Sequence, residues 1–174
     1  MSDKPTTLPE QFSPIAAFLR GRDTAPAYWQ NGILWIMLAT AEETGGDFTL
    51  MEQLMAKGPQ APRHLHEWMH EGFYILEGHA RFVVDGKTIE AGPGDFLTVP
   101  KKTWHEFEVI TELRFLNWYT PGGFEKLIIG AGVPATARTL PPADLPHPDP
   151  EVLKRLIEKI GMRSPREEGS DDVS

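Results

Sequence analysis

The sequence contains no cysteine among its 174 residues. This absence excludes disulfide bonds, thiolate metal sites and cysteine nucleophiles, so a metal ion would be bound through nitrogen and oxygen atoms. The sequence also lacks an uninterrupted run of about 18 apolar residues, the length that a membrane-spanning helix needs. Residues 1–5 begin no long apolar stretch. We therefore expect a cytoplasmic protein with no membrane partner.

Basic side chains are outnumbered, with 17 Lys and Arg against 25 Asp and Glu and a net charge of −8. Because phosphate backbones repel such a surface, nucleic acid is not an expected partner. Hydrophobic residues make up 40% and charged residues 24% of the chain, which is typical of a globular protein. A chain of this length fits one compact domain.

The composition changes along the chain and predicts four segments. Residues 1–27 form an N-terminal arm, and residues 28–135 form a β-barrel. Residues 136–163 hold a proline-rich connector and a C-terminal helix. Residues 164–174 combine Asp and Glu with Gly and Ser, a composition typical of a disordered acidic tail.

Short runs rich in Val, Ile, Phe and Trp alternate with turn clusters between residues 28 and 127. This pattern is typical of an all-β sandwich or barrel. Asp85-Gly86 predicts a tight hairpin turn, since both positions suit positive φ. The expected strands are Ile33–Thr40, Phe48–Ala56, Arg63–Glu67, Glu71–Leu76, His79–Val84, Lys87–Ala91, Asp95–Val99, Trp104–Val109 and Leu113–Tyr119.

One helix is expected, at Pro150–Ile160. Asp149 is positioned as its N-cap, Pro150 stands at its first position, and Gly161 follows its last turn. Its apolar stripe must pack either on the outer face of the barrel or on a second subunit, and the sequence leaves both open. Exposed barrel edges together with this stripe make a homodimer an expected assembly.

Three histidines and a glutamate carry the chemistry. His64 and His66 are two residues apart on an expected strand, so their side chains point to the same face and can converge on one ion. Glu71 lies on the next strand, and a third histidine, His105, follows a later turn. Three imidazoles and a carboxylate suit one divalent transition metal per chain, whether Fe, Mn, Co, Ni, Cu or Zn. We interpret His70 and His79 as ordinary surface residues.

These spacings resemble the two motifs of the cupin family. The first is Gly58-x5-His64-x-His66-x4-Glu71-x6-Gly78, and the second is Gly94-x5-Pro100-x4-His105. The second motif departs from the family pattern at Lys102, where the family has Gly, and at Val109, where it has Asn. The resemblance implies an all-β cupin jelly-roll barrel with His64, His66, Glu71 and His105 as metal ligands.

Within the cupins, residues 34–135 are similar to single-domain bacterial quercetin 2,3-dioxygenase-like proteins. The similarity includes the segments Glu71-Gly-Phe-Tyr, Pro93-Gly-Asp-Phe, Pro121-Gly-Gly-Phe-Glu-Lys and Gly132-Val-Pro-Ala. It implies a metal-dependent dioxygenase that takes dioxygen and a flavonol, opens the central ring and releases carbon monoxide. Glu71 is then both a metal ligand and the candidate catalytic base for the substrate's hydroxyl proton.

A flat aromatic substrate needs an apolar slot beside the metal. Strand parity directs Phe73, Ile75 and Phe107 toward the interior of the expected barrel, whereas the positions of other aromatic candidates follow less directly from the pattern. The expected substrate-binding residues are Phe73, Ile75, Phe107, Trp104 and Trp35, with Met37 and Trp118 as further neighbours.

Two other functions remain open. The same four ligands serve other cupin enzymes, such as an oxygenase for another phenol or dione, a decarboxylase or an isomerase. A sugar-phosphate isomerase would need basic residues in its pocket, and Arg63 and Arg81 are the nearest candidates. The other possibility is a small-molecule-binding cupin without turnover, whose usual sign would be a missing ligand.

Overall fold

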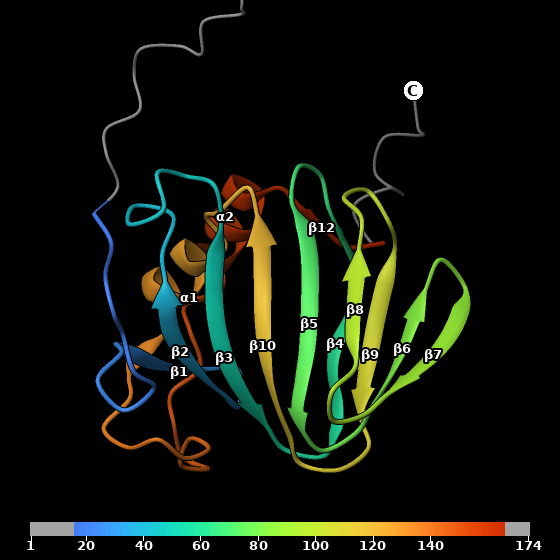
Figure 1. The fold of residues 1–174 in the computed structure, drawn as a ribbon, viewed down its shortest axis with the longest axis horizontal. Coiled ribbons are helices and arrows are strands. Elements are labelled where there is room, and N and C mark those ends of the chain that lie inside the picture. The colour runs from blue at the N-terminus through green and yellow to red at the C-terminus, as the bar shows by residue number, and fades with distance from the viewer. Residues whose placement is uncertain (1–15, 166–174) are drawn as a thin grey trace, which may run out of the picture.

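The computed structural model describes residues 16–165, which form two antiparallel sheets around a common core (Figure 1). Most of the predicted arm and most of the predicted tail, residues 1–15 and 166–174, lie outside the described part. The predicted all-β barrel with a short C-terminal helix is confirmed. One further short helix also occurs.

The strands divide between a larger and a smaller sheet. The larger sheet has seven strands, in the order β11 (Val133–Pro134), β1 (Ala27–Gln30), β2 (Ile33–Ala39), β3 (Thr49–Met55), β10 (Leu113–Thr120), β5 (His70–Glu77) and β8 (Phe96–Val99). The smaller sheet has five, in the order β12 (Met162–Arg163), β4 (Gly58–His66), β9 (His105–Val109), β6 (Ala80–Val84) and β7 (Lys87–Ala91).

All nine expected strands are present, and most of their bounds shift by one residue. The main difference is β4, which begins at Gly58 rather than at Arg63. Strand β1 was not predicted, although Asn31-Gly32 after it is a hairpin signal. Asn31 and Gly32 have φ values of 52° and 77°, as a type I′ turn requires.

Phenylalanine rings fill the interior between the two sheets. Phe73 packs against Phe82, Phe107 and Phe115, with ring centroids 5.0 to 5.8 Å apart. The alternation of apolar and polar residues along the strands directs these rings inward, where burial of aromatic surface stabilises the barrel. The cluster occupies part of the interior, and a cavity lies beside it.

Helix α1 (Glu125–Ala131) was not predicted. It has only seven residues and no side-chain N-cap, so it lacks the usual sequence signals of a helix start. The carboxylate of Glu125 is buried and accepts hydrogen bonds from the Ala41 backbone N–H, at 3.0 Å, and from the Thr49 hydroxyl. These bonds fix the start of α1 against the larger sheet.

Helix α2 (Pro150–Ile160) has the predicted bounds. Asp149 accepts a hydrogen bond from the Glu151 backbone N–H at 2.8 Å, and Gly161 adopts the left-handed conformation. The apolar face of α2 packs on α1 of the same chain, where Leu156 lies against Gly130. The packing of the stripe, left open by the sequence, is therefore within the chain. After Gly161, β12 pairs with β4 and places Met162 opposite His66.

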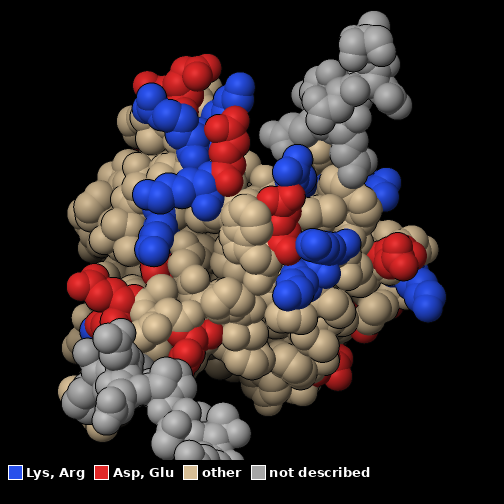
Figure 2. Space-filling view, turned by 90° about the horizontal axis from the view of Figure 1, so that it is seen from above, with Lys and Arg blue, Asp and Glu red and all other residues tan. Residues whose placement is uncertain are grey.

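Between residues 16 and 165, no helix combines the length and apolar character needed to cross a membrane. Acidic and basic side chains are interspersed on the face seen in Figure 2 rather than gathered into one basic patch. This face therefore offers no extended positive surface to a polyanion.

Candidate metal centre

Both sheets contribute to a cluster of three histidines and one glutamate. His64 and His66 lie on β4 and His105 lies directly opposite His64 on β9, whereas Glu71 comes from β5 of the larger sheet. The four side chains are 1% to 7% exposed. Their candidate ligand atoms all lie within 4.8 Å of one another. The structure therefore brings together the four residues that the two motifs single out.

Backbone carbonyl groups fix the orientation of two of the imidazoles. Nδ1 of His64 lies 2.8 Å from the carbonyl oxygen of Pro62, and Nδ1 of His105 lies 3.0 Å from that of Thr103. A carbonyl oxygen can only accept, so each Nδ1 carries the proton and donates it. In the neutral rings, Nε2 then has a free lone pair, as a metal ligand requires.

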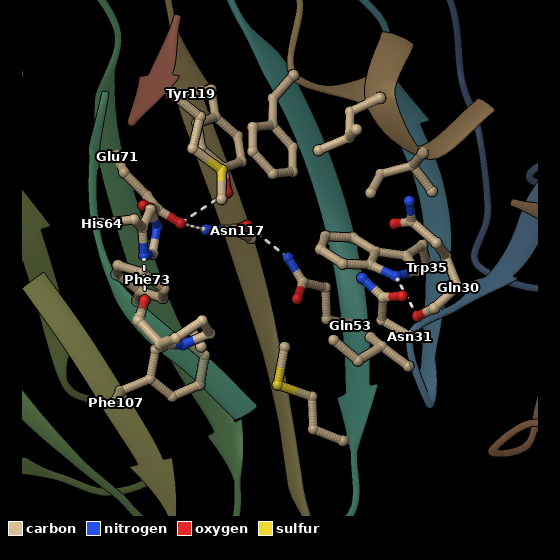
Figure 3. A pocket seen from close by; sticks show the side chains of 18 residues that line it. Gln30, Asn31, Trp35, Gln53, His64, Glu71, Phe73, Phe107, Asn117 and Tyr119 are labelled. Carbon is tan, nitrogen blue, oxygen red and sulfur yellow. Dashed lines mark hydrogen bonds between the residues drawn. The ribbon is translucent and has the colours of Figure 1, made fainter. Parts of the chain in front are cut away.

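The two carboxylate oxygens of Glu71 have different partners. Oε1 accepts hydrogen bonds from the Tyr119 hydroxyl at 2.6 Å and from the Asn117 amide at 3.0 Å. Oε2 faces Nε2 of His105 at 2.9 Å and Nε2 of His66 at 3.1 Å. One oxygen is therefore anchored to β10, and the other points at the histidines (Figure 3).

Burial and close contacts shift the pKa values in this cluster. Burial lowers the pKa of His64 to about 4, and the neighbouring His105 acts in the same direction. Burial opposes ionisation of Glu71, but where Nε2 of His105 and Nε2 of His66 carry a proton, their contacts with the carboxylate outweigh burial and hold its pKa well below the usual range. Burial, followed by the negative charge of Glu71, raises the pKa of Tyr119 well above its usual value. The cluster therefore favours an ionised glutamate and a protonated tyrosine.

The donor set fits a divalent transition metal. Neutral imidazoles and a carboxylate are ligands that such ions share, and two of the three rings have Nε2 pointing away from their backbone acceptor. Nδ1 of His66 is buried and has no hydrogen-bond partner within residues 16–165. His64, His66, His105 and Glu71 thus form a buried cluster with the geometry of a metal site, without selecting one metal.

A cavity of about 130 Å³ adjoins this cluster (Figure 3). Both His64 and Glu71 line it. Apolar side chains from both sheets and α1 form most of its wall. Its apolar lining residues are Ile33, Trp35, Met55, Ala61, Pro62, Phe73, Phe107, Phe124, Leu127, Ile128 and Met162.

Three of the five expected substrate-binding residues line the cavity, namely Trp35, Phe73 and Phe107. Ile75 does not, although its parity is inward, because it lies one pleat beyond Phe73 in the filled core. Trp104 lies before the start of β9, where strand parity does not apply, and its ring packs under the Arg63 guanidinium. Met37 and Trp118 do not line the cavity either, and Trp118 is exposed on the outer face.

The basic residues weighed for an isomerase lie elsewhere. Arg63 is exposed, and Arg81 is exposed and pairs with Glu90 and Glu108. Within the described residues, the cavity lining contains no Lys or Arg. His70 and His79 are exposed, in agreement with their interpretation as surface residues.

Several polar residues of the site were not predicted. Asn117 and Tyr119 on β10, Gln53 on β3 and Gln30 on β1 are all buried and line the cavity. A partial signal was available, because Asn117 and Tyr119 share the inward parity of the core residue Phe115. Polar residues are uncommon at inward strand positions, so a polar residue there indicates a candidate functional residue.

Lys102 keeps the turn that the family pattern assigns to Gly. Its φ is 63°, and its backbone N–H donates to the carbonyl oxygen of His66 at 2.7 Å. Lys102 therefore adopts a left-handed conformation that glycine adopts more readily, and a non-glycine residue pays an energetic cost for it. This turn connects the strand before it to His105.

Comparisons with known proteins agree with this geometry. Residues 51–119 match the family model described as Cupin domain. A Bacillus subtilis (strain 168) protein named quercetin 2,3-dioxygenase is 32% identical over 127 residues, 71% of this chain and 36% of that protein. An uncharacterised protein of Methanocaldococcus jannaschii is 34% identical over 62 residues, 36% of this chain and 50% of that protein. The matches therefore span only about a third to a half of these relatives.

Solved structures show the same fold at lower identity. KdgF from Halomonas sp. has a TM-score of 0.54 at 17% identity, over 62% of this chain and 96% of that one. A predicted oxalate decarboxylase from Thermotoga maritima has a TM-score of 0.54 at 21% identity, over 60% of this chain and 99% of that one. The chain carries a cupin domain and belongs to the cupin superfamily, with the Bacillus protein named quercetin 2,3-dioxygenase as a distant homologue.

Proposed function

We propose that this protein is a metal-dependent dioxygenase that opens the central ring of a flavonol-like aromatic substrate. Both atoms of dioxygen enter the ring-opened ester, and the carbon that is lost leaves as carbon monoxide. The observation that carries the proposal is the position of the cluster, since His64 and Glu71 face directly into a cavity walled by aromatic and aliphatic side chains. The distant homologue named quercetin 2,3-dioxygenase supports the flavonol as substrate.

His64, His66, His105 and Glu71 would hold one divalent metal per chain. Such an ion lowers the pKa of a coordinated hydroxyl, so the substrate's anion becomes available near neutral pH. Trp35, Phe73 and Phe107 would contact the faces and edges of the aromatic rings and exclude water from the reacting end.

Glu71 has two roles in this proposal. Its Oε1 is held by Tyr119 and Asn117, which fixes the carboxylate and leaves Oε2 directed at the cluster. Because Oε2 faces the histidines, Glu71 can be a metal ligand and can accept the substrate's hydroxyl proton transiently. Tyr119, with its raised pKa, keeps its proton and acts as a donor to Glu71.

The size of the cavity favours a second candidate, an oxygenase of a smaller phenol or dione. Sites for drug-sized ligands usually measure about 300–1,000 Å³, whereas this cavity measures about 130 Å³. A one-ring enol fits that space more readily than three fused and linked rings do. A flavonol would need α1 or β12 to move outward, because Leu127 and Met162 lie in the wall.

The test begins with the metal-loaded protein and quercetin in air. The proposal predicts loss of flavonol absorbance, uptake of one dioxygen per quercetin consumed, and release of carbon monoxide. His66→Ala should abolish all three, whereas His70→Ala, which changes an exposed histidine close in sequence, should leave them unchanged.

Assays with flavonols and with small enols and diones distinguish the flavonol dioxygenase from the second candidate. Turnover of small enols and diones, with no change in flavonol absorbance, would replace the flavonol with a smaller substrate. Metal-loaded protein that consumes no dioxygen with either group would contradict the dioxygenase proposal.

A further inference from the structure

Polar side chains cross the inner face of the larger sheet in a line. They come from strands in the order β1, β3, β10 and β5, with Gln30, Gln53, Asn117 and Glu71 respectively. All four are at most 5% exposed and line the cavity. Figure 3 shows Glu71 and His64 at one end of this line and Gln30 and Trp35 at the other. The cavity therefore has a polar end far from the histidines.

Hydrogen bonds fix the orientation of each amide in turn. The Asn117 NH2 group donates to Glu71 Oε1 at 3.0 Å and to the Gly72 carbonyl oxygen at 3.1 Å. Both partners only accept, so the Asn117 side-chain oxygen must point the other way. That oxygen accepts a hydrogen bond from the NH2 group of Gln53. The carboxylate of Glu71 thus determines the orientation of Gln53 through Asn117.

The last group in this series of hydrogen-bonded side chains is an acceptor at the cavity wall. Oε1 of Gln53 is buried and has no hydrogen-bond partner among residues 16–165. Nε2 of Gln30 is also buried and without a partner in that part of the chain. A buried amide atom left without a partner costs about 1–3 kcal/mol. Ligand groups that donate to Gln53 and accept from Gln30 would remove this cost.

We propose that Gln53, at the end of the cavity that also holds Gln30, forms a subsite for a neutral hydroxyl group of the substrate. The proposal rests on the proposed function, because it places the substrate's acidic oxygen at the histidine cluster of the same cavity. A hydroxyl can donate to the unpartnered oxygen of Gln53 without carrying a charge, so it matches this amide. A charged group would be costly here, since the cavity lining offers it no Lys or Arg. The substrate class is therefore an aromatic enol with a second, neutral hydroxyl at its opposite end.

The test compares ligands that differ only by that hydroxyl. One pair is small, kojic acid and allomaltol, two hydroxypyranones with a hydroxymethyl or a methyl group opposite the enol. The other pair is larger, an unsubstituted flavonol and the same flavonol with one hydroxyl on its pendant phenyl ring. Dissociation constants are measured by calorimetry on zinc-loaded protein, because zinc has no redox chemistry and the ligands are not consumed.

We expect the hydroxylated member of at least one pair to bind about tenfold more tightly to the native protein. In Gln53→Met, which replaces the amide with an apolar chain of similar length, this ratio should fall to about one. Gln30→Met should reduce it in the same direction. Phe107→Leu is the control, because it trims the cavity wall without touching an amide and should weaken both members equally. Zinc content verifies that each variant retains the cluster.

The outcomes separate the subsite from the proposed function. A ratio that is lost in Gln53→Met for the pyranones, with no binding of either flavonol, would support the subsite and contradict the flavonol. A ratio that persists in Gln53→Met and Gln30→Met, or equal binding of both members of each pair, would overturn the subsite whatever the substrate. Absence of binding by all four ligands would overturn it as well.

Discussion

The hydroxyl of Tyr119 donates to Oε1 of Glu71 at 2.6 Å, which turns the other oxygen of that carboxylate toward the histidines. Oε2 then lies 2.9 Å from Nε2 of His105. The ring of Tyr119 is itself held by stacking on Phe124, with centroids 4.2 Å apart. The position of Glu71 is thus fixed by a residue outside both sequence motifs.

Removing this hydroxyl should weaken metal binding without unfolding the barrel. We expect Tyr119→Phe to lower metal affinity by about tenfold, because groups that orient metal ligands typically contribute 10–100-fold. The measurement is competition against a chelator of known affinity. Tyr74→Phe is the matched control, since Tyr74 is exposed on the neighbouring strand β5. An unchanged affinity in Tyr119→Phe would show that Asn117 alone orients the carboxylate.

The phenylalanine cluster should dominate the stability of the barrel. Phe82 is 0% exposed and packs on Phe73 and Phe107 at 5.0 and 5.1 Å. Phe82→Ala should therefore lower the free energy of unfolding by about 3–5 kcal/mol, through lost burial and the cavity left behind. Phe96→Ala, at a residue 56% exposed on the outer face, should lower it by less than about 1 kcal/mol. Denaturant unfolding of both variants checks the contrast, and equal losses would contradict the assigned core.

Replacing the left-handed residue in the turn before His105 with glycine should stabilise the protein. Lys102 has φ of 63°, a conformation that costs a non-glycine residue about 1–2 kcal/mol. Lys102→Gly should therefore raise the free energy of unfolding by about 0.5–1 kcal/mol, the remainder being offset by the greater freedom of glycine in the unfolded chain. Lys101→Gly, at the preceding residue, should give no gain. Thermal or denaturant unfolding distinguishes them, and a loss of stability in Lys102→Gly would refute the strain.

Acid should remove one contribution to stability that comes from Glu43. The Arg20 guanidinium donates to both oxygens of this carboxylate, at 2.5 and 2.8 Å, and holds the pKa of Glu43 at about 2, below its ordinary value of 4.5. Since the folded-state pKa is the lower one, the stabilisation is complete above pH 4.5 and disappears as the pH falls toward 2. The pair is partly exposed, so solvent screening limits its contribution to about 1 kcal/mol.

The corresponding measurement compares Glu43→Gln with the native chain across this pH range. The difference in unfolding free energy should be present at neutral pH and should vanish in strong acid. Glu42→Gln is the control, because it removes a carboxylate at an exposed neighbouring position. The same pH profile for both variants would rule out the Arg20 pair as its cause.

Local patterns predicted much of the fold and the four clustered residues. The i, i+2 spacing of His64 and His66 encodes a shared face, and Asp149, Pro150 and Gly161 encode both ends of α2. These signals predict the folded structure correctly because strand parity and helix capping depend on residues only a few positions apart. The homodimer, the cytoplasmic location and the absence of a nucleic-acid partner stay predictions.

Other parts of the site depend on pairings between distant strands. Gln53 and Asn117 are 64 residues apart in the chain, and they meet because β3 and β10 are neighbours in the sheet. No short motif specifies that neighbourhood. Ile75 and Trp104 illustrate the converse, since parity alone does not give the depth of a residue in the barrel or the direction of a side chain before the strand begins.

The most direct test of the metal centre is the metal content of the purified protein. After loading and desalting, elemental analysis should find close to one transition metal ion per native chain and per His70→Ala chain. His66→Ala lacks one imidazole and, once its fold is verified by circular dichroism, should retain less than about a tenth of that amount. Native protein that cannot be loaded, or His66→Ala protein that retains a full equivalent, would contradict the assignment of His64, His66, Glu71 and His105 as a metal site.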